Sequence, residues 1–145
     1  MSPASFEVLV IDLLSKLGYG GGQPERGQVI GGPGDAGIDG VINEDALGLD
    51  RVYVQAKRYG AGNAVGRPEV QAFSGSLDGV SATKGILITT GSISPAVREY
   101  SSRIAKRIIL IDGMQLARLM VAQEMGVRVT ETYRIKKIDE NYFTE

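Results

Sequence analysis

Two short segments rich in apolar residues, at 85–90 and 108–111, constrain the fold of this chain more than any other feature. Runs of this length suit strands buried on both faces, which occur mainly in parallel sheets covered by helices. Between the two runs, Ser94 and Pro95 form a typical helix start, and apolar residues at helical spacing follow them. A strand, a helix and a strand in this order predict two parallel strands at the centre of an α/β sheet.

The rest of the chain predicts further elements of the same sheet. Serine or aspartate N-caps, proline in the first turn and apolar residues every three or four positions indicate helices, whereas alternating apolar and polar residues indicate strands. The helices are expected at 3–17, 68–77, 95–106 and 113–125, and the remaining strands at 28–30, 38–42, 51–59 and 127–138. Strands 38–42 and 51–59 are expected to pair antiparallel. The order predicts a mixed β-sheet with helices on both faces.

Length and composition favour one domain over residues 1–145. No apolar run approaches the roughly 18 residues that a membrane-spanning helix needs, and the first residues lack the pattern of a signal peptide. The chain has no cysteine, which excludes disulfides and thiolate metal sites. We therefore expect a cytoplasmic protein without membrane partners.

The absence of histidine excludes several classes of enzyme. Catalysis by Ser-His-Asp or Cys-His groups and zinc held by histidine are impossible, so a reaction would use carboxylates, lysine, hydroxyls or a hard metal ion. Oxygen ligands favour magnesium, with manganese and calcium as alternatives. The net charge of −1 and the pI near 5.6 argue mildly against nucleic acid as a partner, but the second half of the chain is the more basic half.

Three residues form the strongest candidate site. Asp39 lies between glycines at the start of an expected strand, and glycine there lets a ligand or another backbone approach closely. In the next strand, alternation places Gln55 and Lys57 on the face opposite Val52, Val54 and Ala56. If the two strands pair, all three side chains converge at one sheet edge. A carboxylate can hold a divalent cation that activates water, and a lysine can stabilise the transition state of phosphodiester hydrolysis.

Five segments in order resemble a known family. GDAGIDG at 34–40, VQAKRY at 54–59, VQAFSG at 70–75, KGILITT at 84–90 and the ending IDENYF at 138–143 are similar to the Mrr-type catalytic domain. This domain is the nuclease part of type IV, modification-dependent restriction enzymes in the PD-(D/E)xK superfamily. The resemblance covers nearly the whole chain and implies a restriction-endonuclease-like fold.

The resemblance also implies roles for single residues. Asp39 matches the metal-binding aspartate, Lys57 the catalytic lysine, and Gln55 the second acidic position, where Mrr-type members commonly have glutamine. Glu7 matches an acid that can complete the metal site, and Gln71 a helix position that faces it. The sequence departs from the wider superfamily in two respects: Ile38 replaces a proline, and an amide replaces the second acid. The uncharged amide weakens metal binding unless Glu7 or Asp35 compensates.

Structural roles for the same residues stay open. Asp39 and Asp35 could accept hydrogen bonds within a glycine-rich turn, and Gln55 and Lys57 could lie on a solvated strand face. Glu7 could stabilise the dipole of the first helix, and Gln71 could be structural.

We therefore expect a magnesium-dependent DNA endonuclease domain of a restriction system, acting as a homodimer or larger homo-oligomer. The alternatives are a nuclease specific for branched DNA, similar to Holliday-junction resolvases, and a catalytically weak DNA-binding or scaffold module. Full-length Mrr-type proteins usually add an N-terminal winged-helix domain that recognises DNA. Residues 1–145 contain none, which suggests an excised catalytic domain or a short member of the family.

Overall fold

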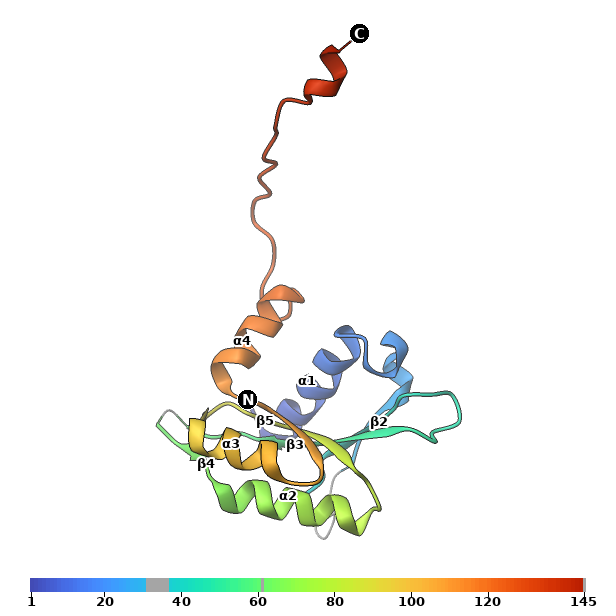
Figure 1. Cartoon of the computed structure of the whole chain (residues 1–145), viewed down its shortest axis with the longest axis vertical. Coiled ribbons are helices and arrows are strands. Elements are labelled where there is room, and N and C mark those ends of the chain that lie inside the picture. Colours follow the sequence, from blue (N-terminus) through green and yellow to red (C-terminus); the bar gives the residue numbers. More distant parts are fainter. Residues whose placement is uncertain (31–36, 61, 145) are drawn as a thin grey trace.

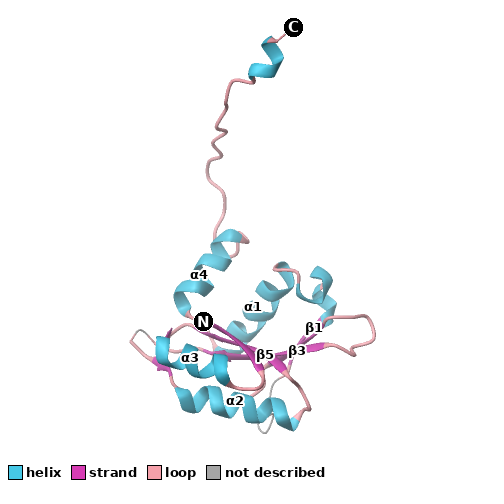
Figure 2. Ribbon diagram, viewed as in Figure 1, coloured by secondary structure: helices cyan, strands magenta, loops and turns pink. Residues whose placement is uncertain are grey.

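A five-stranded mixed sheet forms the centre of the computed structural model, which describes residues 1–30, 37–60 and 62–144 (Figures 1 and 2). The strands follow one another across the sheet in the order β1 (Gly27–Val29), β2 (Gly40–Asn43), β3 (Arg51–Lys57), β5 (Lys84–Thr89) and β7 (Arg107–Ile111). The first three strands pair antiparallel, whereas β3, β5 and β7 are parallel to one another. The expected α/β class and the antiparallel pairing of β2 with β3 are confirmed.

Helices cover both faces of this sheet, as expected (Figure 1). On one face lie α1 (Pro3–Lys16) and α4 (Gly113–Ala122), and on the other lie α2 (Arg67–Gly79) and α3 (Pro95–Arg103). The sheet divides the core into two clusters. The first joins α1 and α4 to the strands through Phe6, Val10, Leu14, Val52, Val54, Ile86, Ile88 and Leu116. The second joins α2 and α3 to the other face through Val70, Phe73, Leu77, Leu87, Val97, Ile108 and Leu110.

The first helix begins and ends where its sequence indicates. The Ser2 hydroxyl accepts a hydrogen bond from the Ser5 N–H at 3.1 Å, and Gly18 follows the helix with a φ of 104°. The helix also packs closely on β2, because a Cβ at Gly40 would lie 2.6 Å from Cδ1 of Ile11. The lack of a side chain at Gly40 therefore allows α1 to pack closely on β2, the strand that follows Asp39.

The strand β7 lies at the edge of the sheet, so its expected central position was wrong. Its outward carbonyl groups have partners on α3: the Ser101 hydroxyl donates to the Ile108 carbonyl at 3.4 Å, and Arg98 donates to the Leu110 carbonyl at 3.1 Å. Ile108 and Leu110 remain buried, which explains the apolar run. Ile109 is 45% exposed. An edge strand whose acceptors are occupied by side chains is protected from pairing with another strand.

The strand expected at 127–138 does not form. Residues 127–139 have no regular secondary structure, and the chain runs away from the sheet towards the short 3₁₀ helix η3 (Glu140–Phe143) (Figure 1). Alternating apolar residues do occur there, but Tyr133 is 83% and Ile135 is 99% exposed. A strand needs a neighbour to satisfy its backbone groups, and no described strand pairs with this segment.

Several shorter elements lie outside the expectations. The 3₁₀ helices η1 (Tyr19–Gly22) and η2 (Pro24–Arg26) connect α1 to β1, and the two-residue strands β4 (Ala64–Val65) and β6 (Ser92–Ile93) form a second, parallel sheet. Neither strand of that pair is among the strands expected from the sequence. No helix in the described part of the chain is long and apolar enough to cross a membrane.

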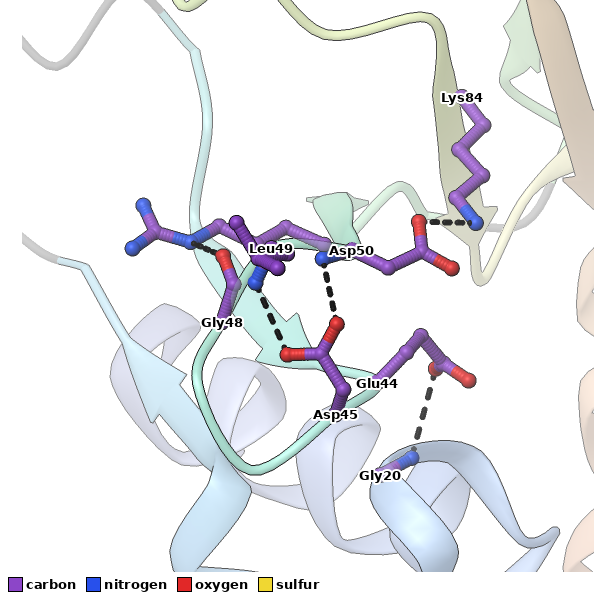
Figure 3. A network of polar contacts seen from close by, with 8 residues as sticks. Gly20, Glu44, Asp45, Gly48, Leu49, Asp50 and Lys84 are labelled. Atoms are coloured by element: carbon purple, nitrogen blue, oxygen red, sulfur yellow. Dashed lines mark hydrogen bonds and ion pairs between the residues drawn. The ribbon is translucent and has the colours of Figure 1, made fainter.

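The turn between β2 and β3 is held by one carboxylate (Figure 3). Asp45 accepts hydrogen bonds from the Leu49 N–H at 2.9 Å and from the Asp50 N–H at 3.0 Å. The side chain of Asp50 in turn forms an ion pair with Lys84 at the start of β5, with 2.6 Å between nitrogen and oxygen. These contacts set the start of β3 and thereby the positions of the residues that follow along the strand.

The hydrogen bond from the Leu49 N–H, followed by those from Asp50 and its neighbours, lowers the pKa of Asp45 from the ordinary value of an aspartate. Because this pKa is lower in the folded turn than in the unfolded chain, the ionised carboxylate stabilises the turn above the ordinary value. The stabilisation is lost as the pH falls through the lowered pKa. We expect the amide resonances of Leu49 and Asp50 to titrate together, with a midpoint below the ordinary pKa of an aspartate. In an NMR titration, Asp45→Asn should abolish this transition. A midpoint at or above the ordinary aspartate pKa would contradict the assignment.

Asp112 connects three elements at the opposite edge of the sheet. Its carboxylate accepts from the Gln115 N–H at the start of α4 at 2.8 Å and from Arg98 of α3 at 3.1 Å. These two interactions, the first being the larger, lower the pKa of Asp112. Asp112→Ala removes the N-cap and should lower the free energy of unfolding by about 1 kcal/mol, measured by urea denaturation. Asp12→Ala, at an exposed position on α1, is the matched control. Equal midpoints for the two variants would argue against this role.

Candidate active site

The backbone of Asp39 lies between two strands, one residue before β2. Its N–H donates to the Val54 carbonyl of β3 at 2.8 Å, and its carbonyl accepts from the Ile30 N–H at 2.7 Å. Asp39 is therefore held on both sides before its side chain is considered. Since β2 and β3 pair antiparallel, this position lies opposite the middle of β3.

The carboxylate of Asp39 bonds directly to β3. Its Oδ2 accepts a hydrogen bond from the Ala56 N–H at 2.7 Å. Ala56 stands between Gln55 and Lys57 in the chain, so this bond brings the acid to the stretch of strand that carries both other candidates. The side chain of Asp39 is half-buried. A short bond to a fixed N–H leaves the carboxylate little freedom to rotate.

Gln55 is buried, with 6% of its surface exposed, and therefore does not lie on a solvated strand face. Its Oε1 is buried without a hydrogen-bond partner among the residues that the structure describes. Its Nε2 lies close to Gly37, which has a φ of 80° and where a Cβ would stand only 2.7 Å away. Only glycine fits this position without displacement. An amide oxygen that is buried and unbonded is unusual in a folded protein, because its desolvation is uncompensated.

Lys57 is the last residue of β3 and is half-buried. Within the described ranges its ammonium group forms no hydrogen bond or ion pair, in contrast to Lys84 and Lys106, which both pair with aspartates. Residues 55–57 of β3 thus bring three features together. Gln55 contributes a buried amide oxygen, the Ala56 N–H holds the carboxylate of Asp39, and Lys57 begins its side chain at the next position.

The oxygen atoms of Asp39 and Gln55 fit a hard divalent cation. Carboxylate and amide oxygens are ligands of magnesium and manganese, and a cation would also explain why Gln55 Oε1 is buried without a partner among the described residues. The described residues contain no group of three acidic side chains that could hold a metal ion. Among the described residues the donor set is therefore poor in charge, as the glutamine in the sequence indicated.

The remaining candidates are Glu7, Gln71 and Asp35. Glu7 is half-buried on α1, on the side of the sheet that carries Val54. Gln71 is exposed on α2, and no described contact links it to Asp39 or Gln55. Asp35 lies outside the described residues.

A group of contacts at the end of β3 was missed by the sequence analysis. The Thr90 hydroxyl accepts from the Tyr59 N–H and donates to the Tyr59 carbonyl, each at 2.7 Å, and the Thr90 N–H donates to the Lys57 carbonyl at 3.1 Å. The Tyr59 hydroxyl donates to Glu69 at 3.4 Å. Burial, and next the charge of Glu69, raises the pKa of Tyr59. The available signal was a threonine directly after a buried strand.

Comparison with known proteins identifies the family of this chain. The family model of the Mrr catalytic domain, described as a restriction endonuclease, matches residues 1–120. The chain is also 46% identical over 143 residues to the type IV methyl-directed restriction enzyme EcoKMrr of Escherichia coli strain K12. The match covers 99% of this chain and 45% of EcoKMrr, so the chain spans less than half the length of this relative.

Solved structures show the same fold at lower identity. The DNA modification-dependent restriction endonuclease AspBHI superposes with a TM-score of 0.65 at 22% identity, over 83% of this chain and 31% of that protein. The restriction endonuclease MspJI, solved in complex with a 27-mer oligonucleotide, gives a TM-score of 0.60 at 24% identity, over 81% and 27%. From the family match and the relative in E. coli, it follows that the chain belongs to the Mrr-type catalytic domain family of restriction endonucleases.

Proposed function

We propose that this chain is the cleavage domain of a restriction system and hydrolyses phosphodiester bonds of modified DNA. The observation that carries the proposal is the hydrogen bond between the Asp39 carboxylate and the Ala56 N–H at 2.7 Å. It places a fixed acid beside the strand positions of Gln55 and Lys57. The relative EcoKMrr is methyl-directed by name, and AspBHI is modification-dependent, which supports modified DNA as the substrate.

In this proposal each residue has one role. Asp39 and Gln55 supply the oxygen ligands for a magnesium ion, with manganese as an alternative, and Glu7 or Asp35 adds charge to the site. When bound, such an ion polarises the phosphate and lowers the pKa of a coordinated water. Lys57 carries its ammonium group to the same edge of the sheet, where it stabilises the negative charge that develops on the phosphate. Gly37 keeps space beside the Gln55 amide.

Partners and location belong to the same proposal. A homodimer or larger homo-oligomer would supply the two sites that cleavage of both DNA strands needs. The chain spans 45% of EcoKMrr, and the proposal concerns cleavage, without assigning recognition of the modified base to a residue. A cytoplasmic location, expected from the sequence, stays a prediction.

Cleavage of supercoiled plasmid tests the function directly. Methylated, unmethylated and branched DNA are compared with magnesium, with manganese and with EDTA. The proposal predicts metal-dependent nicking that prefers methylated over branched DNA. Preference for branched DNA would support the resolvase-like alternative, and binding without cleavage under all conditions would support the DNA-binding module.

Lys57→Ala should lower the rate of cleavage by about 100- to 1,000-fold, the usual cost of removing one electrostatic contact to a transition state. The fold should remain, because the ammonium group forms no ion pair within the described part of the chain. Asp39→Asn is the better test of the acid than alanine, since an amide oxygen can still accept from the Ala56 N–H while the charge is lost. Circular dichroism and thermal melting confirm folding. A folded Lys57→Ala protein with wild-type cleavage would exclude lysine from the reaction.

Gln55→Glu should strengthen metal binding and weaken the metal-free protein. A second carboxylate beside Asp39 adds charge to the donor set, but without a cation it is a buried charge close to a like charge. We expect a lower melting temperature than wild type in EDTA and a larger stabilisation by magnesium, measured by thermal denaturation. Gln28→Glu, at an exposed position on β1, is the control. Equal magnesium dependence in the Gln55→Glu variant and wild type would place the metal elsewhere.

A further inference from the structure

The end of the strand that carries Lys57 needs a constraint that the strand itself does not provide. Lys57 is the last residue of β3, and its pairing with β5 ends at Thr89. The next residues lead into a segment containing Gly60 and Gly62, which is a flexible composition. A lysine side chain adds several rotatable bonds of its own. Unless the backbone at 57–59 is fixed, the ammonium group has no defined position.

Thr90 supplies this constraint with three hydrogen bonds to two residues. Its hydroxyl accepts a hydrogen bond from the Tyr59 N–H and donates one to the Tyr59 carbonyl, both at 2.7 Å. The donor and one acceptor position of the hydroxyl are therefore both bonded to the backbone of Tyr59. Its own N–H donates to the Lys57 carbonyl at 3.1 Å. The backbone directly before and after Arg58 is therefore held by a single side chain and its amide.

The contact is reinforced by the residue that follows. A Cβ at Gly91 would lie 3.1 Å from Cβ of Tyr59 and 2.5 Å from the Asn63 carbonyl oxygen, so the chain at 90–91 packs directly on the strand end. The backbone around the end of β3 is thus held on two sides. On the β2 side the Ala56 N–H bonds to Asp39, and on the β5 side Thr90 bonds to residues 57 and 59.

We propose that Thr90 is a positioning residue for Lys57, resting on the nuclease function proposed above. It acts through the backbone of residues 57–59 and does not contact the reacting atoms. Thr90 itself is exposed, so burial does not explain the two bonds of its hydroxyl. Loss of the hydroxyl should therefore make the backbone at the end of β3 less ordered, while the core stays intact.

Thr90→Val keeps the shape of the side chain and removes both hydroxyl bonds, whereas Thr90→Ser keeps them. For plasmid cleavage with magnesium, we expect Thr90→Val to lower kcat about tenfold, because small displacements of a catalytic group are costly, with KM for DNA unchanged. Thr90→Ser should retain kcat close to wild type. Thr83→Val, an exposed threonine before the other end of β5, is the matched control and should change neither constant.

Hydrogen exchange of the Tyr59 amide separates this proposal from the proposed function, since it needs no activity. In Thr90→Val the Tyr59 amide should lose protection, while the amide of Ala56, bonded to Asp39, should keep it. Unchanged protection of the Tyr59 amide would show that the Thr90 hydroxyl does not hold the backbone of Tyr59, whether or not the chain is a nuclease. Faster exchange with wild-type kcat would overturn positioning, and a raised KM with unchanged kcat would instead indicate that Thr90 contacts DNA.

Discussion

The site depends on one hydrogen bond, between the Asp39 carboxylate and the Ala56 N–H. In an antiparallel pair this N–H would ordinarily find a backbone carbonyl of the neighbouring strand. Here an acidic side chain takes that place, so the acid becomes part of the sheet. As a result, the negative charge of Asp39 lies at Ala56, the residue between Gln55 and Lys57. Close packing at Gly37 and Gly40 makes this possible, because side chains at either position would displace Gln55 or Ile11.

Much of the fold could be predicted from sequence because local signals and burial agree. The caps at Ser2, Ser94 and Asp112 are present as expected, and the strand expected at 85–90 forms as the buried internal strand Lys84–Thr89. The strand at 127–138 was predicted on the same kind of alternation and does not form. Alternation reports that a segment could lie on a sheet; it does not report whether a neighbouring strand is available. The position of β7 depends likewise on side chains of α3 that only the fold brings near.

Some features of the candidate site could likewise be predicted from the sequence, and others could not. Alternation along β3 placed Gln55 and Lys57 on one face, and the glycines around Asp39 indicated a close approach. The burial of Gln55, and an amide oxygen without a partner among the described residues, could not be predicted, because they arise from packing between β3 and residues distant in the chain such as Gly37. The contacts of Thr90 join residues 31 positions apart in the chain, and no local pattern reports such a pairing.

Binding of a divalent cation between Asp39 and Gln55 is tested most directly by manganese titration followed by NMR. Manganese broadens the resonances of nuclei close to it. If the cation binds there, the side-chain amide of Gln55 and the N–H of Ala56 should broaden at the lowest manganese concentrations. This selectivity should be lost in Asp39→Asn. Selective broadening at the acidic turn of Asp45 and Asp50, with Gln55 unaffected, would contradict binding at this site.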